Sequence, residues 1–281
     1  MYENRNEATT KARTPSLSDK YQLQYFDELL GHEILLKRLE QHFRFHVPPV
    51  RCLLLTGAKN CGMNALAKFI IQYRCCEYFP YRSLFKRCRC RFCIRPQAYL
   101  EFHAMEFALM KHQERTMEML NHSLFYKTPP GGTLGVLVYA VQKLQGWEKA
   151  SWLIDICIRN PRIFFILTSP WFKYIHPCIR NICLHNNLGA YLQIKPISLT
   201  ACTTFLFRLL HQENLPLPRS WCESLIITMN KPRPGSILEQ LEDILPSIKK
   251  LLASTKDRPS DSHIYELLRT GFANQHATHR I

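Results

Sequence analysis

Residues 57–64 read Gly-Ala-Lys-Asn-Cys-Gly-Met-Asn, a run that keeps the glycine frame of a phosphate-binding P-loop. The P-loop pattern is Gly, four residues, Gly, Lys and then Ser or Thr. Gly57 and Gly62 hold the glycine positions, but Met63 stands at the lysine position and Asn64 at that of the magnesium-binding hydroxyl. Because no lysine reaches the β- and γ-phosphates, the loop is predicted to persist as a fold element without hydrolysing a nucleotide.

The flanks of this loop have the context that a P-loop requires. An apolar run, Cys52-Leu-Leu-Leu-Thr56, predicts a strand before it, and the run Ala65-Leu-Ala-Lys-Phe-Ile-Ile71 predicts a helix after it. Lys59 is the only cation inside the loop. It could touch a phosphate, but we expect its side chain to point to solvent. ATP binding is therefore not expected.

Further along the chain, strands alternate with helices. Residues 135–141 and 162–169 are continuous apolar runs, typical of parallel strands buried on both faces, and residues 147–158 between them predict a helix. Residues 99–102 predict another strand, and residues 192–195 a last edge strand. This alternation predicts an α/β fold with a parallel sheet flanked by helices.

The last third of the chain has a different character. After Pro196 the pattern predicts helices only, at residues 199–213, 219–229 and 234–252. The expected organisation is a disordered basic tail at 1–20, a P-loop α/β domain at 21–195 that contains a cysteine-rich module at 75–95, a helical lid at 196–255, and a polar tail at 256–281 with one short helix near 263–268.

Composition narrows the class of protein and of partner. The 281 residues carry 37 Lys and Arg against 22 Asp and Glu, so the formal net charge is +15. This excess favours an anionic partner, either nucleic acid or an acidic protein face, with a merely solvated basic surface as the alternative. Residues 1–20 show no signal-peptide pattern, and the twelve cysteines suit a reducing compartment. We therefore expect a cytoplasmic protein.

Five of the cysteines gather in residues 75–95, a short irregular segment that predicts an inserted module. Zinc needs four thiolate or imidazole ligands at the corners of a tetrahedron, and Cys90-Arg-Phe-Cys93 can form one knuckle of such a site. The alternative is a set of free thiols in a basic loop. The expected zinc ligands are Cys76, Cys88, Cys90 and Cys93, with Cys75 as the alternative to Cys76.

Arginines are interleaved with these cysteines. Arg87, Arg89 and Arg91 are candidates for contacts with nucleic-acid phosphates. They could equally form a solvated cationic face or offset the negative charge of a four-thiolate zinc centre. The scattered histidines, His32 among them, keep no metal-ligand spacing with carboxylates and are expected at the surface.

The order of these pieces resembles the clamp-loader branch of the AAA+ proteins, and most closely the delta-prime subunits of bacterial DNA polymerase III. The resemblance extends over residues 26–241, with the P-loop at the Walker A position and the cysteine cluster where these subunits carry a small zinc module. Residues 136–141 match the Walker B strand, residues 164–169 the sensor 1 strand, and residues 231–238 the lid signature.

Several departures from this pattern concern catalysis and assembly. Ala140 and Val141 replace the acidic pair of Walker B. Active members end the segment after sensor 1 with Ser-Arg-Cys, whose arginine reaches the neighbour's γ-phosphate, whereas this chain has Asn181-Ile-Cys183. Arg180 is the candidate for a contact in trans, although its helix face differs by roughly 200°. Because about 40 residues follow residue 241, the family's helical collar is expected to be truncated or absent.

The resemblance implies a subunit that is not an enzyme in its own right and acts as a rigid stator in a hetero-oligomer. Its expected partners are the ATPase subunits and the delta subunit, with primer–template DNA met indirectly and no membrane. One alternative is a zinc-containing nucleic-acid-binding protein that reuses a dead P-loop scaffold outside the replisome. Another is a weak nucleotide-binding switch.

Overall fold

The computed structural model describes residues 21, 32–45, 50–79, 81, 83, 88–94, 99–107, 113–126, 128, 132–185, 188–215, 217–229, 232–254 and 260–278. The segment 1–20, predicted to be disordered, lies outside these residues. Among the described helices, none is both long and apolar enough to cross a membrane.

Five parallel strands form one sheet in the order β2-β3-β4-β1-β5. The two long apolar runs became β3 and β4 in the middle of the sheet, and β5 lies at an edge, as predicted. The strands are β1 (Cys52–Gly57), β2 (Tyr99–His103), β3 (Leu134–Tyr139), β4 (Ile163–Ser169) and β5 (Gly189–Ile194).

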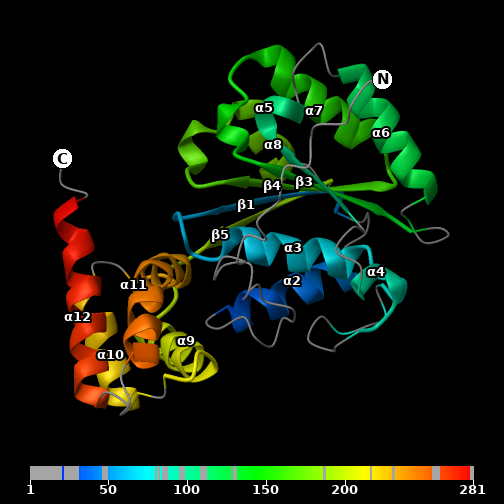
Figure 1. The fold of residues 1–281 in the computed structure, drawn as a ribbon. Coiled ribbons are helices and arrows are strands. Elements are labelled where there is room, and N and C mark those ends of the chain that lie inside the picture. The colour runs from blue at the N-terminus through cyan, green and yellow to red at the C-terminus, as the bar shows by residue number, and fades with distance from the viewer. Residues whose placement is uncertain are drawn as a thin grey trace, which may run out of the picture.

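Helices cover both faces of this sheet, which confirms the predicted fold class (Figure 1). One face carries α2 (Glu33–Phe45) and α3 (Met63–Arg74). The other carries α5 (Ala104–Phe107), α6 (Gln113–Tyr126), α7 (Trp147–Arg159) and α8 (Pro177–His185). Along β1, Cys52 and Leu54 enter the core beneath α7 and α8, whereas Leu53 and Leu55 enter the core beneath α2 and α3. Burial on both faces explains why the strands read as unbroken apolar runs.

The C-terminal region is helical and has a core of its own. The predicted helices are present as α9 (Leu199–Gln212), α10 (Arg219–Thr228) and α11 (Pro234–Ser254). Ser198 begins α9, because its side-chain oxygen accepts a hydrogen bond from the backbone N–H of Ala201 at 3.2 Å. In Figure 1 this helical region lies beside the sheet, and α9 follows directly from β5.

A fourth helix, α12 (Asp261–Thr278), extends well beyond the short helix predicted near residues 263–268. Ile264 and Leu268 are fully buried in the core of the helical region, so α12 belongs to that region. The sequence signal was weak because only one narrow stripe of this helix is apolar. Among residues 261–270, Tyr265 and Leu267 pack at the margin of that core, and the positions besides these and the two buried residues are polar.

Candidate metal centre and degenerate P-loop

The loop at residues 57–64 has the strand–loop–helix geometry that its glycine frame predicts. Gly57 is the last residue of β1, and Gly62 immediately precedes α3. Gly62 has φ 84°, a left-handed conformation that glycine adopts without steric cost. Asn60 is also left-handed, with φ 65°, and asparagine tolerates this conformation better than most residues. The frame of a P-loop is therefore intact.

The side chains at the two replaced positions have different surroundings. Met63 is half-buried and packs against the apolar core that α2 and α3 share with the sheet, whereas Asn64 is exposed. The Lys59 side chain is exposed as well. At the position where a P-loop lysine would reach phosphate oxygens, this chain thus places a thioether that stabilises its own core.

The carboxyl end of β3 carries no acidic side chain in residues 139–142. Val141 is fully buried, and Ala140 follows the strand in a left-handed conformation. The nearby carboxylate belongs to Glu101 on β2, which accepts a hydrogen bond from the Tyr139 hydroxyl at 2.5 Å and pairs with Lys68 at 3.2 Å. Burial, followed by the hydrogen bond to Glu101, raises the pKa of Tyr139. Glu101 is thus engaged in a structural pair on the neighbouring strand.

The start of α11 binds directly to the P-loop. The guanidinium of Arg233 donates to the backbone carbonyl of Lys59 at 2.7 Å, and the backbone N–H of Gly235 donates to the carbonyl of Asn60 at 3.2 Å. The Asn60 side-chain amide in turn donates to the Glu239 carboxylate at 2.9 Å. We call this set of three hydrogen bonds the lid–loop latch. It joins segments more than 170 residues apart in sequence.

The latch requires a glycine at position 235. A Cβ atom there would lie 2.9 Å from the Asn60 Cβ and 3.1 Å from the Asn60 Cα, closer than normal packing allows. Helix α11 therefore approaches the loop at backbone distance. The loop is thus held directly by the protein's own helical region.

His32 also lies beside this loop, which corrects the expectation of a surface histidine. Its side chain is only 7% exposed, and it is hydrogen-bonded to the backbone of Cys61. Burial lowers the pKa of His32 despite that hydrogen bond. The sequence could not predict the contact between His32 and Cys61, because the two residues come together only in the folded chain.

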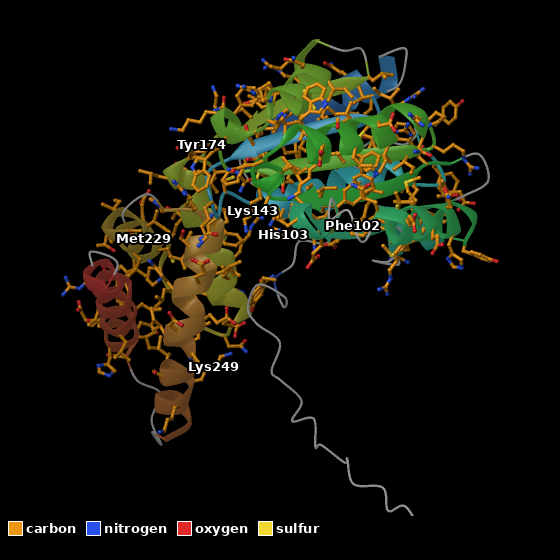
Figure 2. All side chains as sticks on the ribbon, turned by 90° about the horizontal axis from the view of Figure 1, so that it is seen from above. Phe102, His103, Lys143, Tyr174, Met229 and Lys249 are labelled. Atoms are coloured by element: carbon orange, nitrogen blue, oxygen red, sulfur yellow. The ribbon has the colours of Figure 1, made fainter. Side chains whose placement is uncertain are left out.

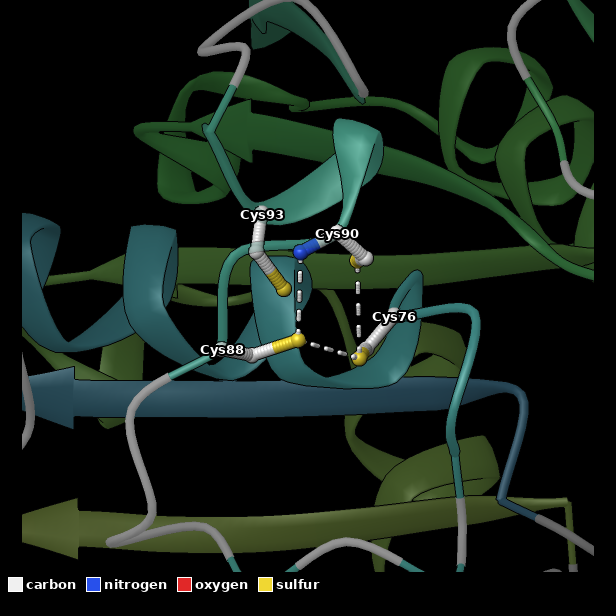
Figure 3. A group of neighbouring side chains, drawn as sticks. All are labelled: Cys76, Cys88, Cys90 and Cys93. Atoms are coloured by element: carbon white, nitrogen blue, oxygen red, sulfur yellow. Dashed lines mark hydrogen bonds between the residues drawn. The ribbon is translucent and has the colours of Figure 1, made fainter.

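Four of the clustered cysteines come together next to the end of α3 (Figure 3). The sulfur atoms of Cys76, Cys88, Cys90 and Cys93 all lie within 4.8 Å of one another. Sγ of Cys76 is 3.8 Å from that of Cys88 and 3.9 Å from that of Cys90. Cys90 precedes the short helix α4 (Arg91–Ile94), and Cys93 lies within it.

These distances fit a zinc ion. Zn–S bonds of about 2.3 Å in a tetrahedron separate the sulfur atoms by about 3.8 Å. The backbone N–H groups of Tyr78 and Cys90 donate to the sulfurs of Cys76 and Cys88, each at 3.4 Å, and such contacts support thiolates. The one-residue spacing between Cys88 and Cys90 is therefore compatible with a four-thiolate group that can hold a metal ion.

The structure also separates Cys75 from this cluster. Cys75 is 1% exposed and belongs to the core beneath α2 and α3, close to Gly135 of β3. Burial raises the pKa of the Cys75 thiol to about 12. Of the two cysteines that the sequence left open, Cys76 is the one in the group.

The arginines in and beside the cysteine module differ in exposure. Arg89 is exposed beside the cysteines, Arg87 lies outside the described residues, and Arg91 begins α4 with a side chain outside them. Arg74 does not project outward: its guanidinium carbon lies 4.2 Å from the ring centroid of Phe79. Burial lowers the pKa of Arg74. Arg74 thus packs the cysteine module onto α3.

Arg180 on α8 is half-buried. Its guanidinium carbon lies 5.6 Å from the ring centroid of Phe172, and its Nε is buried without a hydrogen-bond partner among the described residues. Ile182, the middle residue of the triplet compared above with Ser-Arg-Cys, is buried in the core with Cys183. Position 182 is therefore a core position in this chain.

Comparison with known proteins supports the fold. No family model matches the chain, and no curated protein is similar to it in sequence. Among solved structures, PCH-2 of C. elegans, a AAA+ ATPase, is similar with a TM-score of 0.59 over 89% of this chain and 70% of that one. The two chains are 12% identical, a level at which the similarity shows the fold alone. The chain thus has a AAA+ fold.

Proposed function

We propose that this chain is a non-catalytic clamp-loader subunit in the delta-prime position of a DNA polymerase III holoenzyme. The lid–loop latch is the observation that carries the proposal. In an active P-loop protein the loop backbone and its lysine bind the nucleotide phosphates. Here Arg233, Gly235 and Glu239 bind the loop directly.

Such a subunit would act as a stator. Its P-loop domain and helical region would give neighbouring ATPase subunits a surface of constant shape, while ATP is bound and hydrolysed elsewhere in the assembly. The four clustered cysteines would hold zinc, which would cross-link the module through thiolates and supply no catalysis. Arg180, or the surface around it, is the part of α8 that would face a neighbour.

Affinity purification of the tagged chain from its native host tests this role. We expect ATPase subunits and a delta subunit among the partners identified by mass spectrometry, retained at high ionic strength. The high-salt step matters because a net charge of +15 attracts anionic proteins and nucleic acid without specificity. An equally basic tagged protein is the control. If no replication subunit is retained, the stator role is wrong.

The zinc-containing nucleic-acid-binding protein is a second candidate because Arg89 is exposed beside the four thiols and Tyr81 is 92% exposed close by in sequence. It predicts salt-sensitive binding of DNA or RNA by the isolated chain. Replacing Arg87, Arg89 and Arg91 together should abolish that binding. Retention of full binding by the triple variant would rule this candidate out.

A further inference from the structure

Exposed aromatic side chains gather at the carboxyl edge of the sheet. Because the strands are parallel, the segments that follow β3 and β4 emerge at the same edge. Trp147 follows β3 at the start of α7, and Trp171 and Tyr174 follow β4 at the 3-10 helix η4 (Phe172–Tyr174). These three side chains are 66%, 56% and 55% exposed. Two of the four tryptophans in the chain thus lie in water at one edge.

Ring contacts link these residues in two pairs, which lie within one short stretch of chain after β4 and at the start of α7. The Trp171 and Tyr174 rings lie 5.9 Å apart at an interplanar angle of 87°. His176, two residues further on, lies 6.1 Å from the Trp147 ring. We call these four residues the carboxyl-edge aromatic surface. Exposed tryptophans grouped in this way indicate a binding surface, because isolated soluble proteins seldom leave such rings uncovered.

Two lysines lie on the same edge as these rings. The Lys173 ammonium lies 4.7 Å from the Tyr174 ring centroid. Lys143 is exposed in the 3-10 helix η3 (Val141–Lys143), and Figure 2 shows it on the same edge as Tyr174. Residues 140–149 and 170–180 together contain four Lys or Arg and one acidic residue, Glu148. The edge therefore offers aromatic rings and positive charge together.

We propose that the carboxyl-edge aromatic surface binds single-stranded nucleic acid. Unpaired bases would stack on Trp147, Trp171 and Tyr174, and Lys143 and Lys173 would contact the phosphates. A single strand supplies both flat rings and regularly spaced anions, which are the two features that this edge complements. A duplex keeps its bases stacked on one another and would satisfy only the charges. The inference adds a direct nucleic-acid contact and does not depend on the clamp-loader role.

Fluorescence anisotropy with labelled oligothymidylate and the purified full-length chain tests the proposal. We expect binding that quenches tryptophan fluorescence and is stronger than binding of a duplex of equal length. The double variant Trp147→Ala, Trp171→Ala should lose affinity by roughly 5- to 150-fold per stacked base. The double variant Lys143→Glu, Lys173→Glu should weaken binding and reduce the salt dependence by about two phosphate contacts.

Matched controls lie elsewhere on the surface. Tyr126→Ala removes a 77% exposed ring from α6, and Lys37→Glu reverses an exposed charge on α2. Both should bind like the unchanged chain, and thermal unfolding should show that every variant is folded.

Three outcomes would overturn the proposal. If the tryptophan variant binds oligothymidylate normally while the lysine variant does not, the protein binds the oligonucleotide by charge alone. If only Arg89→Ala reduces binding, the cysteine module is the site. If oligothymidylate does not bind but the tryptophan variant loses partners in the affinity purification, this edge is a protein interface. None of these results alters the test of the stator role, which measures partners of the unchanged chain.

Discussion

At the scale of single residues, the side chains that a P-loop ATPase uses are replaced at several positions. Met63 buries its side chain where a cation would project, and Ala140 and Val141 offer no oxygen to magnesium. The loop is in addition hydrogen-bonded to Arg233. Restoring the P-loop lysine alone should therefore leave the magnesium-binding carboxylates missing and the hydrogen bond to Arg233 in place.

The double variant Met63→Lys, Asn64→Thr tests this distribution. We expect neither ATP turnover nor an ATP-dependent rise in melting temperature, because the replaced Walker B pair and the lid–loop latch remain. A phosphate-release assay and thermal unfolding with and without Mg-ATP measure both, with an intact AAA+ ATPase as the positive control. Turnover by the variant, or by the unchanged chain, would contradict the claim that the chain is inert.

His32 makes the region beside the loop sensitive to pH. Burial lowers its pKa below the ordinary 6.5, so the unfolded chain binds this proton more readily than the folded one. The contribution of His32 to stability is thus fully present above pH 6.5 and is lost as pH falls toward the lowered folded-state pKa.

The variant His32→Asn should therefore reduce the loss of stability on acidification through this range, measured by urea unfolding at several pH values. His263→Asn removes an exposed histidine from α12 and serves as the control. Identical pH profiles for the unchanged chain and His32→Asn would show that His32 does not titrate with unfolding.

At the scale of elements, the cysteine module is a short connection with a small apolar cluster among its described residues. Its buried members are Cys76, Cys90 and Phe92, with Phe79 packed against them. Such a small cluster supplies little hydrophobic stabilisation, so a bound metal would have to hold the segment together.

We expect the purified chain to contain one zinc ion, and Cys93→Ser to bind it far more weakly. Loss of one of four thiolates should also make the module sensitive to proteolysis, because its order depends on the cross-link. Metal analysis and limited proteolysis measure the two effects. Cys178→Ser, which replaces a half-buried cysteine outside the cluster, is the control and should retain the metal. A metal-free chain with an intact module would contradict the prediction.

At the scale of the whole molecule, the latch connects the helical region to the P-loop at the edge of the sheet. Three hydrogen bonds from Arg233, Gly235 and Asn60 join α11 to the P-loop. A hydrogen bond of this kind contributes about 1 kcal/mol net, so the latch is strong enough to bias the position of the lid and weak enough to be removed by mutation.

The double variant Asn60→Gly, Arg233→Ala should release the helical region while leaving both cores folded. Glycine at position 60 preserves the left-handed backbone and removes only the side chain. Loss of two bonds should speed amide hydrogen exchange at residues 57–62 and 234–239 by roughly 30-fold. Arg219→Ala, which removes a hydrogen bond to Thr204 within the helical region, is the control. Unchanged exchange in the double variant would show that other contacts hold the lid.

Much of the fold could be predicted from sequence because its signals are local. The apolar runs that became β3 and β4 are buried on both faces, and Pro196 separates the sheet from the helices. Helix α12 was underestimated because Ile264 and Leu268 form too sparse a stripe to reveal that a core already exists beside them. The cluster of four thiols was predictable from spacing, but the choice between Cys75 and Cys76 was not.

By itself, the sequence determined which chemistry is missing: no P-loop lysine, no magnesium-binding hydroxyl and no Walker B carboxylates. These are properties of residue type at fixed spacing, and folding cannot restore them. Only the tertiary structure decided that Arg233 and Gly235 meet the P-loop, that His32 is buried, and that two tryptophans share one edge with lysines. Such contacts join segments far apart in the chain, and they exist only when the sheet and helices have packed.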